Sequence, residues 1–165
     1  MTLVHVTTEI AAPPQKVFGT VMDPFQLRDW VTIHRSLSRV SEDPMTAGAR
    51  MDQSLHLHGL TFTVHWTLVG VRPPFEAEWE GRGPALSHAR IHYGLSGPPE
   101  GPTTFEYINE FGAPGGVLGR IASRVVVGQT SEREAHRSLA RLKALIEKGA
   151  GSEQSAVDTG HGHHG

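Results

Sequence analysis

Cysteine is absent from this chain of 165 residues, which excludes disulfides, thiol nucleophiles and thiolate metal sites. Long apolar runs are also missing, since none approaches the ~20 residues that a membrane-spanning helix needs. The N-terminal residues 1–5 lack a basic segment followed by an apolar one, so no secretory signal is expected and the cytoplasm is the expected location. The formal net charge of −2 lacks the basic excess of a general nucleic-acid binder.

Enough apolar sequence is present for one folded domain. Hydrophobic residues make up 38% of the chain, which suits a core and argues against wholesale disorder. We expect a single domain over residues 1–149. Residues 150–165 are small, polar and glycine-rich, so they are expected to form a disordered tail. The eleven histidines are unusually many, and they invite a metal or acid–base interpretation.

The first third of the chain predicts a strand and two short helices. Apolar residues alternate over residues 2–11, as in a half-buried strand. Pro13-Pro14 then favour the start of a helix that ends near Met22, and Asp23 is a capping residue for a second helix. The apolar residues of that second helix are Phe25, Leu27 and Trp30. A further strand is expected over residues 35–42.

Alternation continues over residues 49–112 and predicts five more strands. Gly59-Leu60 suit a tight hairpin turn, which would place Leu57 opposite Phe62. The predicted inward residues are Met51, Gln53, Leu55, Leu57, Leu60, Phe62, Val64, Trp66, Leu68, Phe75, Ala77, Trp79, Ala89, Ile91, Tyr93, Leu95, Phe105, Tyr107, Asn109 and Phe111.

The last third changes to a period of three or four residues and predicts one long helix. Its stripe consists of Leu118, Ile121, Val125, Gly128, Glu132, Ala135, Leu139, Leu142 and Ile146. A bend or break is expected near Gly128, and Gly149 is expected to end the helix. Two positions of Glu132 stay open. Facing inward it would be a candidate acid or base, because desolvation raises the pKa of a carboxyl group; with a bend it would face solvent.

The order of these elements resembles the helix-grip fold of the START/Bet v 1-like superfamily. Residues 11–18, followed by Asp23 and Trp30, resemble the entry pattern of that superfamily. The segments that resemble bacterial polyketide cyclase/dehydrase-like (SRPBCC) members are Trp66-Thr67-Leu68, Pro73-Pro74, Trp79, and Glu110-Phe111 before Pro114-Gly115-Gly116. The similarity covers about residues 3–148. Residues 28–34 also resemble an actinobacterial subgroup that includes the toxin of a toxin–antitoxin pair.

This resemblance implies an α+β fold in which a curved antiparallel sheet of about seven strands holds the long C-terminal helix over an apolar cavity. Members bind lipids, sterols, flavonoids or polyketides, and some catalyse cyclisation, aromatisation or dehydration. The expected function is binding of an apolar, cyclic, polyketide- or lipid-like molecule in the cavity. If the protein is an enzyme, we expect a cyclase- or dehydratase-type lyase or isomerase without metal or organic cofactor. The alternative is a protein-interaction or toxin-like role of the outer sheet face.

Inward positions on the strands and apolar positions on the helices supply the ligand-binding candidates, because aromatic rings with polar tips suit a planar ligand. His34 closes the second short helix, near the expected mouth of the cavity. The ligand-binding candidates are Trp30, Gln53, Phe62, Trp66, Trp79, Tyr93, Phe105, Ile121 and Val125. The catalytic candidates are Tyr107, Asn109 and His34. Trp66 and Trp79 are equally compatible with an ordinary core, and His34 with a structural role. The expected partner is a small apolar ligand, with no nucleic acid or membrane span, on a monomer or homodimer.

The same parity turns most histidines outward. His56, His58 and His65 lie on the opposite face from the apolar residues of their strands, with no further ligand in sight, so no metal site is expected. An acidic outer face is predicted instead, formed by Glu76, Glu78, Glu80, Glu106 and Glu110 between His88, Arg90 and His92. Its expected cross-strand pairs are Glu78 with His88, Glu76 with Arg90, and Arg90 with Glu106. His161, His163 and His164 lie in the tail.

Overall fold

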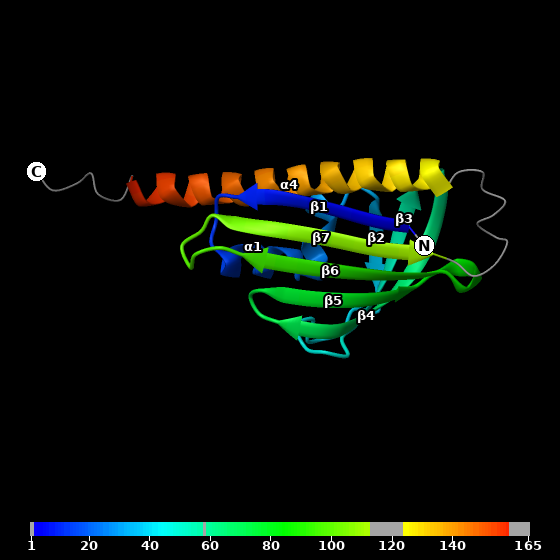
Figure 1. The fold of residues 1–165 in the computed structure, drawn as a ribbon. Helices are drawn as coiled ribbons and strands as arrows, with labels where there is room; N and C mark the ends of the chain where they lie inside the picture. The colour runs from blue at the N-terminus through cyan, green and yellow to red at the C-terminus, as the bar shows by residue number, and fades with distance from the viewer. Residues whose placement is uncertain (1, 58, 113–123, 159–165) are drawn as a thin grey trace, which may run out of the picture.

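A seven-stranded antiparallel sheet with one long helix along it forms the molecule (Figure 1). It is a computed structural model that describes residues 2–57, 59–112 and 124–158, with the side chains of 131–149 in the last range. The strands are β1 (Thr2–Ile10), β2 (His34–Ser38), β3 (Arg50–Leu57), β4 (Leu60–Arg72), β5 (Glu76–Arg82), β6 (His88–Ser96) and β7 (Thr103–Gly112). The helical segments are α1 (Pro14–Val21), η1 (Pro24–Gln26), α2 (Leu27–Trp30), η2 (Pro84–Leu86) and α4 (Arg124–Asp158).

The strand order is β1-β7-β6-β5-β4-β3-β2. Strands β2 to β7 therefore form a meander in chain order, and β1 adds an edge strand beside β7. Side chains alternate between the two faces along each strand, and residues that lie opposite each other share a face. The apolar residues of neighbouring strands therefore lie on the same face of the sheet. The α+β helix-grip fold predicted from the sequence is confirmed.

The short helices after β1 begin where the sequence predicts, but one of their apolar residues, Phe25, is exposed and not buried in the core. Pro14 opens α1, and the Asp23 carboxylate accepts a hydrogen bond of 3.0 Å from the backbone N–H of Phe25. The predicted second helix is a 3₁₀ turn followed by a single α-turn. Phe25 consequently points outward and is 68% exposed, whereas Leu27 and Trp30 are buried.

Strand β2 is shorter than the predicted strand over 35–42. It begins at His34 and ends at Ser38. The next residue, Arg39, has a φ of 50°, in the left-handed region that an extended strand cannot contain. The backbone therefore leaves the sheet four residues before the predicted end.

The hairpin of β3 and β4 pairs in a different register from the predicted one. Leu57 lies opposite Leu60 and Leu55 opposite Phe62, so Leu60 belongs to the strand and not to the turn. Gly59 supplies the positive φ of the turn. Because the shift is an even number of residues, the predicted faces are kept. Leu60 is nevertheless 67% exposed at the tip of the hairpin, which corrects its predicted inward position.

The acidic outer face is present, with different pairs from those predicted. Arg90 lies opposite Glu80 and Glu110, and Glu78 lies opposite His92. Arg90 forms ion pairs with Glu80 and Glu78. The two pairs predicted between β5 and β6 are wrong because β5 continues to Arg82 before its loop begins. The predicted pair of Arg90 with Glu106 is wrong because Glu106 lies opposite Gly94. The loop before β5 likewise leaves Phe75 45% exposed, which corrects its predicted inward position. A partner for this outer face stays a prediction.

Helix α4 packs its apolar stripe against β1 and α2 and runs to Asp158, past the end predicted at Gly149. Residues 150–158 are helical, in contrast to the expected tail, and 159–165 lie outside the described residues. α4 is continuous across Gly128, where a bend was expected. The buried residues of the stripe are Ala135, Leu139, Leu142 and Ile146. Leu118 lies outside the described residues.

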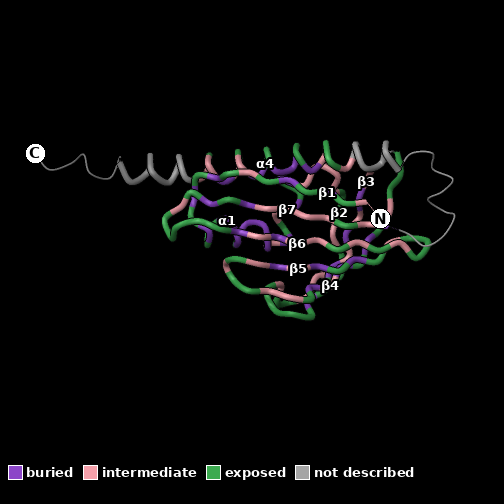
Figure 2. The backbone as a smooth tube through the Cα atoms, viewed as in Figure 1, coloured by how far each residue is buried: buried purple, intermediate pink, exposed green. Residues whose placement is uncertain are grey.

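Burial follows the layered arrangement, with buried segments on the sheet face and the helix side that meet (Figure 2). The largest fully buried side chains include Trp30, Phe105, Leu139 and Leu142. Burying a side chain of this size contributes about 1.5–3 kcal/mol to the stability of the fold. None of the helices in the described part of the chain combines the length and hydropathy needed to cross a bilayer.

Candidate functional site

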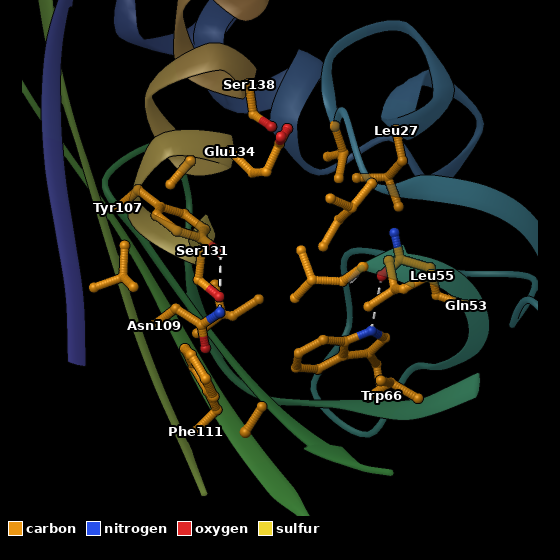
Figure 3. A pocket seen from close by; sticks show the side chains of 18 of the residues that line it. Leu27, Gln53, Leu55, Trp66, Tyr107, Asn109, Phe111, Ser131, Glu134 and Ser138 are labelled. Carbon is orange, nitrogen blue, oxygen red and sulfur yellow. Dashed lines mark hydrogen bonds between the residues drawn. The ribbon is translucent and has the colours of Figure 1, made fainter. Parts of the chain in front are cut away.

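An apolar cavity of about 190 Å³ lies between α4, α2 and the inner face of the sheet. Most of its wall is aliphatic or aromatic. The apolar lining residues are Val4, Leu27, Trp30, Val31, Ile33, Met51, Leu55, Leu57, Phe62, Val64, Trp66, Ala89, Ile91, Tyr93, Phe111, Ala135 and Leu139. The remaining lining residues are Gln53, Tyr107, Asn109, Ser131, Glu134 and Ser138. Figure 3 shows the polar side chains in separate groups on the wall of the cavity.

The first polar group is the Tyr107–Asn109 pair on β7. The two residues are two apart in the strand and so share its inward face. The Asn109 Nδ2 donates to Tyr107 Oη over 3.2 Å, while Asn109 Oδ1 is buried with no hydrogen-bond partner among the described residues. Burial raises the pKa of Tyr107 to about 12. The phenol therefore keeps its proton at neutral pH and acts as a donor, not as a base.

The second polar group joins β4, β3 and β2 and lies across the cavity from the first (Figure 3). The Trp66 indole N–H donates to Gln53 Oε1 over 2.9 Å. Because an indole can only donate, this bond fixes the orientation of the Gln53 amide. The Gln53 Nε2 then donates to His34 Nδ1 over 2.9 Å, so the proton of neutral His34 is on Nε2.

His34 is thus a residue that orients Gln53. It does not line the cavity, and its Nδ1 is occupied as an acceptor. Desolvation by burial lowers the pKa of His34 below its ordinary value of 6.5. Protonation of Nδ1 would place two donors opposite each other and break the chain from His34 to Trp66.

Because the pKa of His34 is lowered, we expect the folded protein to lose stability in acid. Between pH 6.5 and the lower folded-state value, the unfolded chain binds more protons at residue 34 than the folded chain. The free energy of unfolding therefore falls as the pH drops below about 6.5. We expect the His34→Gln variant to lose less stability than the wild type between about pH 7.5 and about pH 5. Urea denaturation of both proteins at the two pH values measures this, and equal losses would contradict it.

The third polar group was missed by the sequence analysis. Thr32, in the segment between α2 and β2, donates its hydroxyl to Glu134 Oε2 over 2.6 Å. Its backbone N–H donates to Ser138 Oγ over 3.1 Å. Glu134 also receives a hydrogen bond of 3.2 Å from Arg137. These contacts connect the helix α4 to the α2–β2 segment at the cavity wall.

Of the two positions left open for Glu132, the solvent-facing one is observed, since Glu132 is exposed and pairs with His136 on the outside of α4 at 3.8 Å. Among the described residues, Glu134 is the carboxylate that lines the cavity. A signal for it was present, since Ser131, Glu134 and Ser138 themselves follow helical spacing beside the apolar stripe.

The Thr32 contacts give a second prediction. Thr32→Val removes the hydroxyl and leaves the partly buried Glu134 carboxylate without one of its donors, which costs about 1–3 kcal/mol of unfolding free energy. Chemical denaturation measures the loss. Thr7→Val, at an exposed position of β1, is the matched control and is expected to stay within ~0.5 kcal/mol of the wild type. A loss for Thr32→Val no larger than for this control would contradict the contact's role.

Five of the predicted ligand-binding residues line the cavity, as do two of the predicted catalytic residues. They are Trp30, Gln53, Phe62, Trp66 and Tyr93, with Tyr107 and Asn109. Trp79 and Phe105 are buried in the core and are not among the lining residues. Ile121 and the side chain of Val125 lie outside the described residues.

Three aromatic rings of the cavity wall form a cluster. The Tyr93 ring lies 6.4 Å from that of Trp30 and 6.1 Å from that of Tyr107, both in tilted arrangements. The Trp30 Nε1 is buried without a partner in the described part of the chain. Among the described residues, no group of histidine, aspartate and glutamate side chains is placed to hold a metal ion.

The chain was compared with known protein families and with curated proteins. The model of a family described as polyketide cyclase / dehydrase and lipid transport matches residues 1–147. No curated protein matches the chain closely.

Three solved structures illustrate the similarity of fold. A protein from Thermus thermophilus has a TM-score of 0.73 at 16% identity, over 87% of this chain and 96% of its own. A START superfamily protein from Mycobacterium smegmatis has a TM-score of 0.71 at 12% identity, over 90% of this chain and 99% of its own. DynU16, from the dynemicin biosynthetic locus, has a TM-score of 0.63 at 21% identity, over 90% of this chain and 48% of its own.

Proposed function

We propose that this chain, which belongs to the polyketide cyclase / dehydrase and lipid transport family, binds an apolar molecule of one or two rings in the cavity under α4. The observation that carries the proposal is the cavity itself, with a wall of aliphatic and aromatic side chains and a few fixed polar groups. Such a combination is typical of small-molecule sites, where apolar contacts supply affinity and polar groups orient the ligand.

The size of the ligand follows from the volume of the cavity. An apolar cavity of about 150 Å³ admits benzene, and this cavity is somewhat larger, at about 190 Å³. A one- or two-ring molecule suits that space, whereas a four-ring sterol or a diacyl lipid exceeds it. Within the range of ligands expected from the sequence, the proposal therefore favours small cyclic polyketides over lipids.

Any chemistry on such a ligand would involve Tyr107. Tyr107 is protonated at neutral pH, since burial raises its pKa to about 12, and it can therefore donate a hydrogen bond to a carbonyl oxygen and so polarise the carbonyl group. The proposal gives His34 no direct contact with the ligand, because His34 is bonded to Gln53 and is not among the residues that line the cavity. Cyclisation or dehydration in this cavity is the enzymatic extension of the proposal, and its signature would be product formation that is lost in Tyr107→Phe.

The binding proposal is tested by titrating a series of ring compounds of increasing size: toluene, naphthalene, anthracene and a four-ring steroid. Trp30 and Trp66 both line the cavity, so their fluorescence reports binding, and calorimetry supplies the dissociation constants. We expect the tightest binding for the two-ring compound and at least about tenfold weaker binding for the steroid. Failure of all four compounds to bind would overturn the proposal.

A further inference from the structure

The Tyr107–Asn109 pair has hydrogen-bonding capacity that the described part of the protein does not use. Tyr107 Oη accepts from Asn109 Nδ2 over 3.2 Å, which leaves the phenol proton free to be donated elsewhere. Asn109 Oδ1 is buried and has no partner among the described residues. One donor and one acceptor therefore lie next to each other on the inward face of β7.

The sheet around the pair offers little else to satisfy these groups. Ser131 of α4 also lines the cavity on this side (Figure 3), but Asn109 Oδ1 has no hydrogen bond to it. The neighbouring lining residues on the sheet are Ile91, directly opposite Asn109 on β6, and Phe111, further along β7. Neither has a polar side-chain atom. Tyr93 lies opposite Tyr107, and burial raises the pKa of Tyr93 above its ordinary value, so this phenol is protonated as well. A buried acceptor that is left unpaired is unfavourable, and a ligand donor that pairs with it removes this penalty.

We propose that the Tyr107–Asn109 pair recognises a hydroxyl group attached to the ring of the ligand, either a phenol or an enol. The ligand oxygen accepts the hydrogen bond of the Tyr107 phenol, and the ligand O–H donates to Asn109 Oδ1. This inference rests on the proposed function and adds the chemical class of the ligand. A hydroxyl fits because it both accepts and donates through one atom.

Three bicyclic probes of nearly equal shape separate the two hydrogen bonds. Naphthalene makes neither, 2-methoxynaphthalene can only accept from Tyr107, and 2-naphthol can make both. Calorimetry on the wild-type protein is expected to give roughly tenfold tighter binding for each added hydrogen bond, in the order naphthalene, 2-methoxynaphthalene, 2-naphthol.

Two variants assign the effects to their residues. In Asn109→Leu, 2-naphthol is expected to bind no more tightly than 2-methoxynaphthalene. In Tyr107→Phe, 2-methoxynaphthalene is expected to bind no more tightly than naphthalene. Thermal melts verify that each variant is folded, and if one is not, the order of the three probes on the wild type still decides the question.

The outcomes distinguish this inference from the function on which it rests. Equal affinity of the wild type for all three probes would overturn hydroxyl recognition and leave the ring-binding cavity intact. Equal affinity for 2-naphthol and 2-methoxynaphthalene would also overturn it, because the pair would then only donate. Failure of all three to bind would overturn both proposals.

Discussion

Replacing Ile91 with tryptophan is expected to weaken binding of a two-ring ligand about a hundredfold or more. Ile91 is on β6, and its side chain lines the cavity. The larger indole would occupy much of a space of about 190 Å³, so the ligand would compete with a covalently attached ring. Because the added atoms enter a cavity and not a packed core, the cost in stability is expected to stay at or below ~1–3 kcal/mol.

The same substitution on the other face of the sheet is a matched control. Ile108 is on the neighbouring strand β7, between the lining residues Tyr107 and Asn109, and so points away from the cavity. Ile108→Trp is expected to bind naphthalene with wild-type affinity. Calorimetric titration of the three proteins makes the comparison. Undiminished binding by Ile91→Trp, with the fold intact, would mean that the ligand site lies elsewhere.

Gly81→Ala is expected to cost about 1–3 kcal/mol of unfolding free energy. Gly81 lies opposite Trp66 in the β4–β5 ladder. A Cβ atom at Gly81 would lie 2.6 Å from Trp66 Cζ3 and 2.7 Å from Val64 Cγ1. Trp66 is 5% exposed, and its indole N–H is bonded to Gln53. The methyl group therefore has to displace the indole into the cavity or break the Gln53 bond, and ligand affinity should fall with stability.

Gly70→Ala provides the control on the partner strand. A Cβ atom there would have Glu78 Cβ at 4.0 Å as its nearest neighbour, which is an ordinary contact. We expect a change within ~0.5 kcal/mol, or a slight stabilisation, because alanine reduces the freedom of the unfolded chain. Urea denaturation compares both variants with the wild type. If Gly81→Ala and Gly70→Ala changed the unfolding free energy by similar small amounts, the Trp66 side chain could move without loss of stability, which would contradict this prediction.

Sequence periodicity predicted the faces of the sheet better than its pairing. The predicted registers of β3–β4 and β5–β6 were both wrong, with Leu57 opposite Leu60 and Glu78 opposite His92. Each error was an even number of residues, and an even shift returns every side chain to the same face. Inward residues such as Gln53 and Tyr107 could therefore be identified without the correct partners. The registers themselves depend on where each turn begins, which the glycines and prolines did not define uniquely.

The polar groups of the cavity were only partly predictable. The inward positions of Gln53, Tyr107 and Asn109 could be predicted because successive side chains of a strand point strictly to opposite faces. Glu134 was missed because a helical stripe is broad, and a carboxylate at its margin can point into a cavity or into solvent. Its inward position depends on the contact with Thr32, which is distant in the sequence. His34 was placed at the cavity mouth, whereas Gln53 lies between it and the ligand space.

A crystal structure of the protein grown with saturating 2-naphthol would show directly whether a ring compound binds under α4. We expect the two rings between α4 and the sheet, in contact with Ile91 and Trp66, with the hydroxyl within hydrogen-bond distance of Tyr107. Ligand density on the outer face of the sheet, or none between α4 and the sheet at saturation, would contradict it.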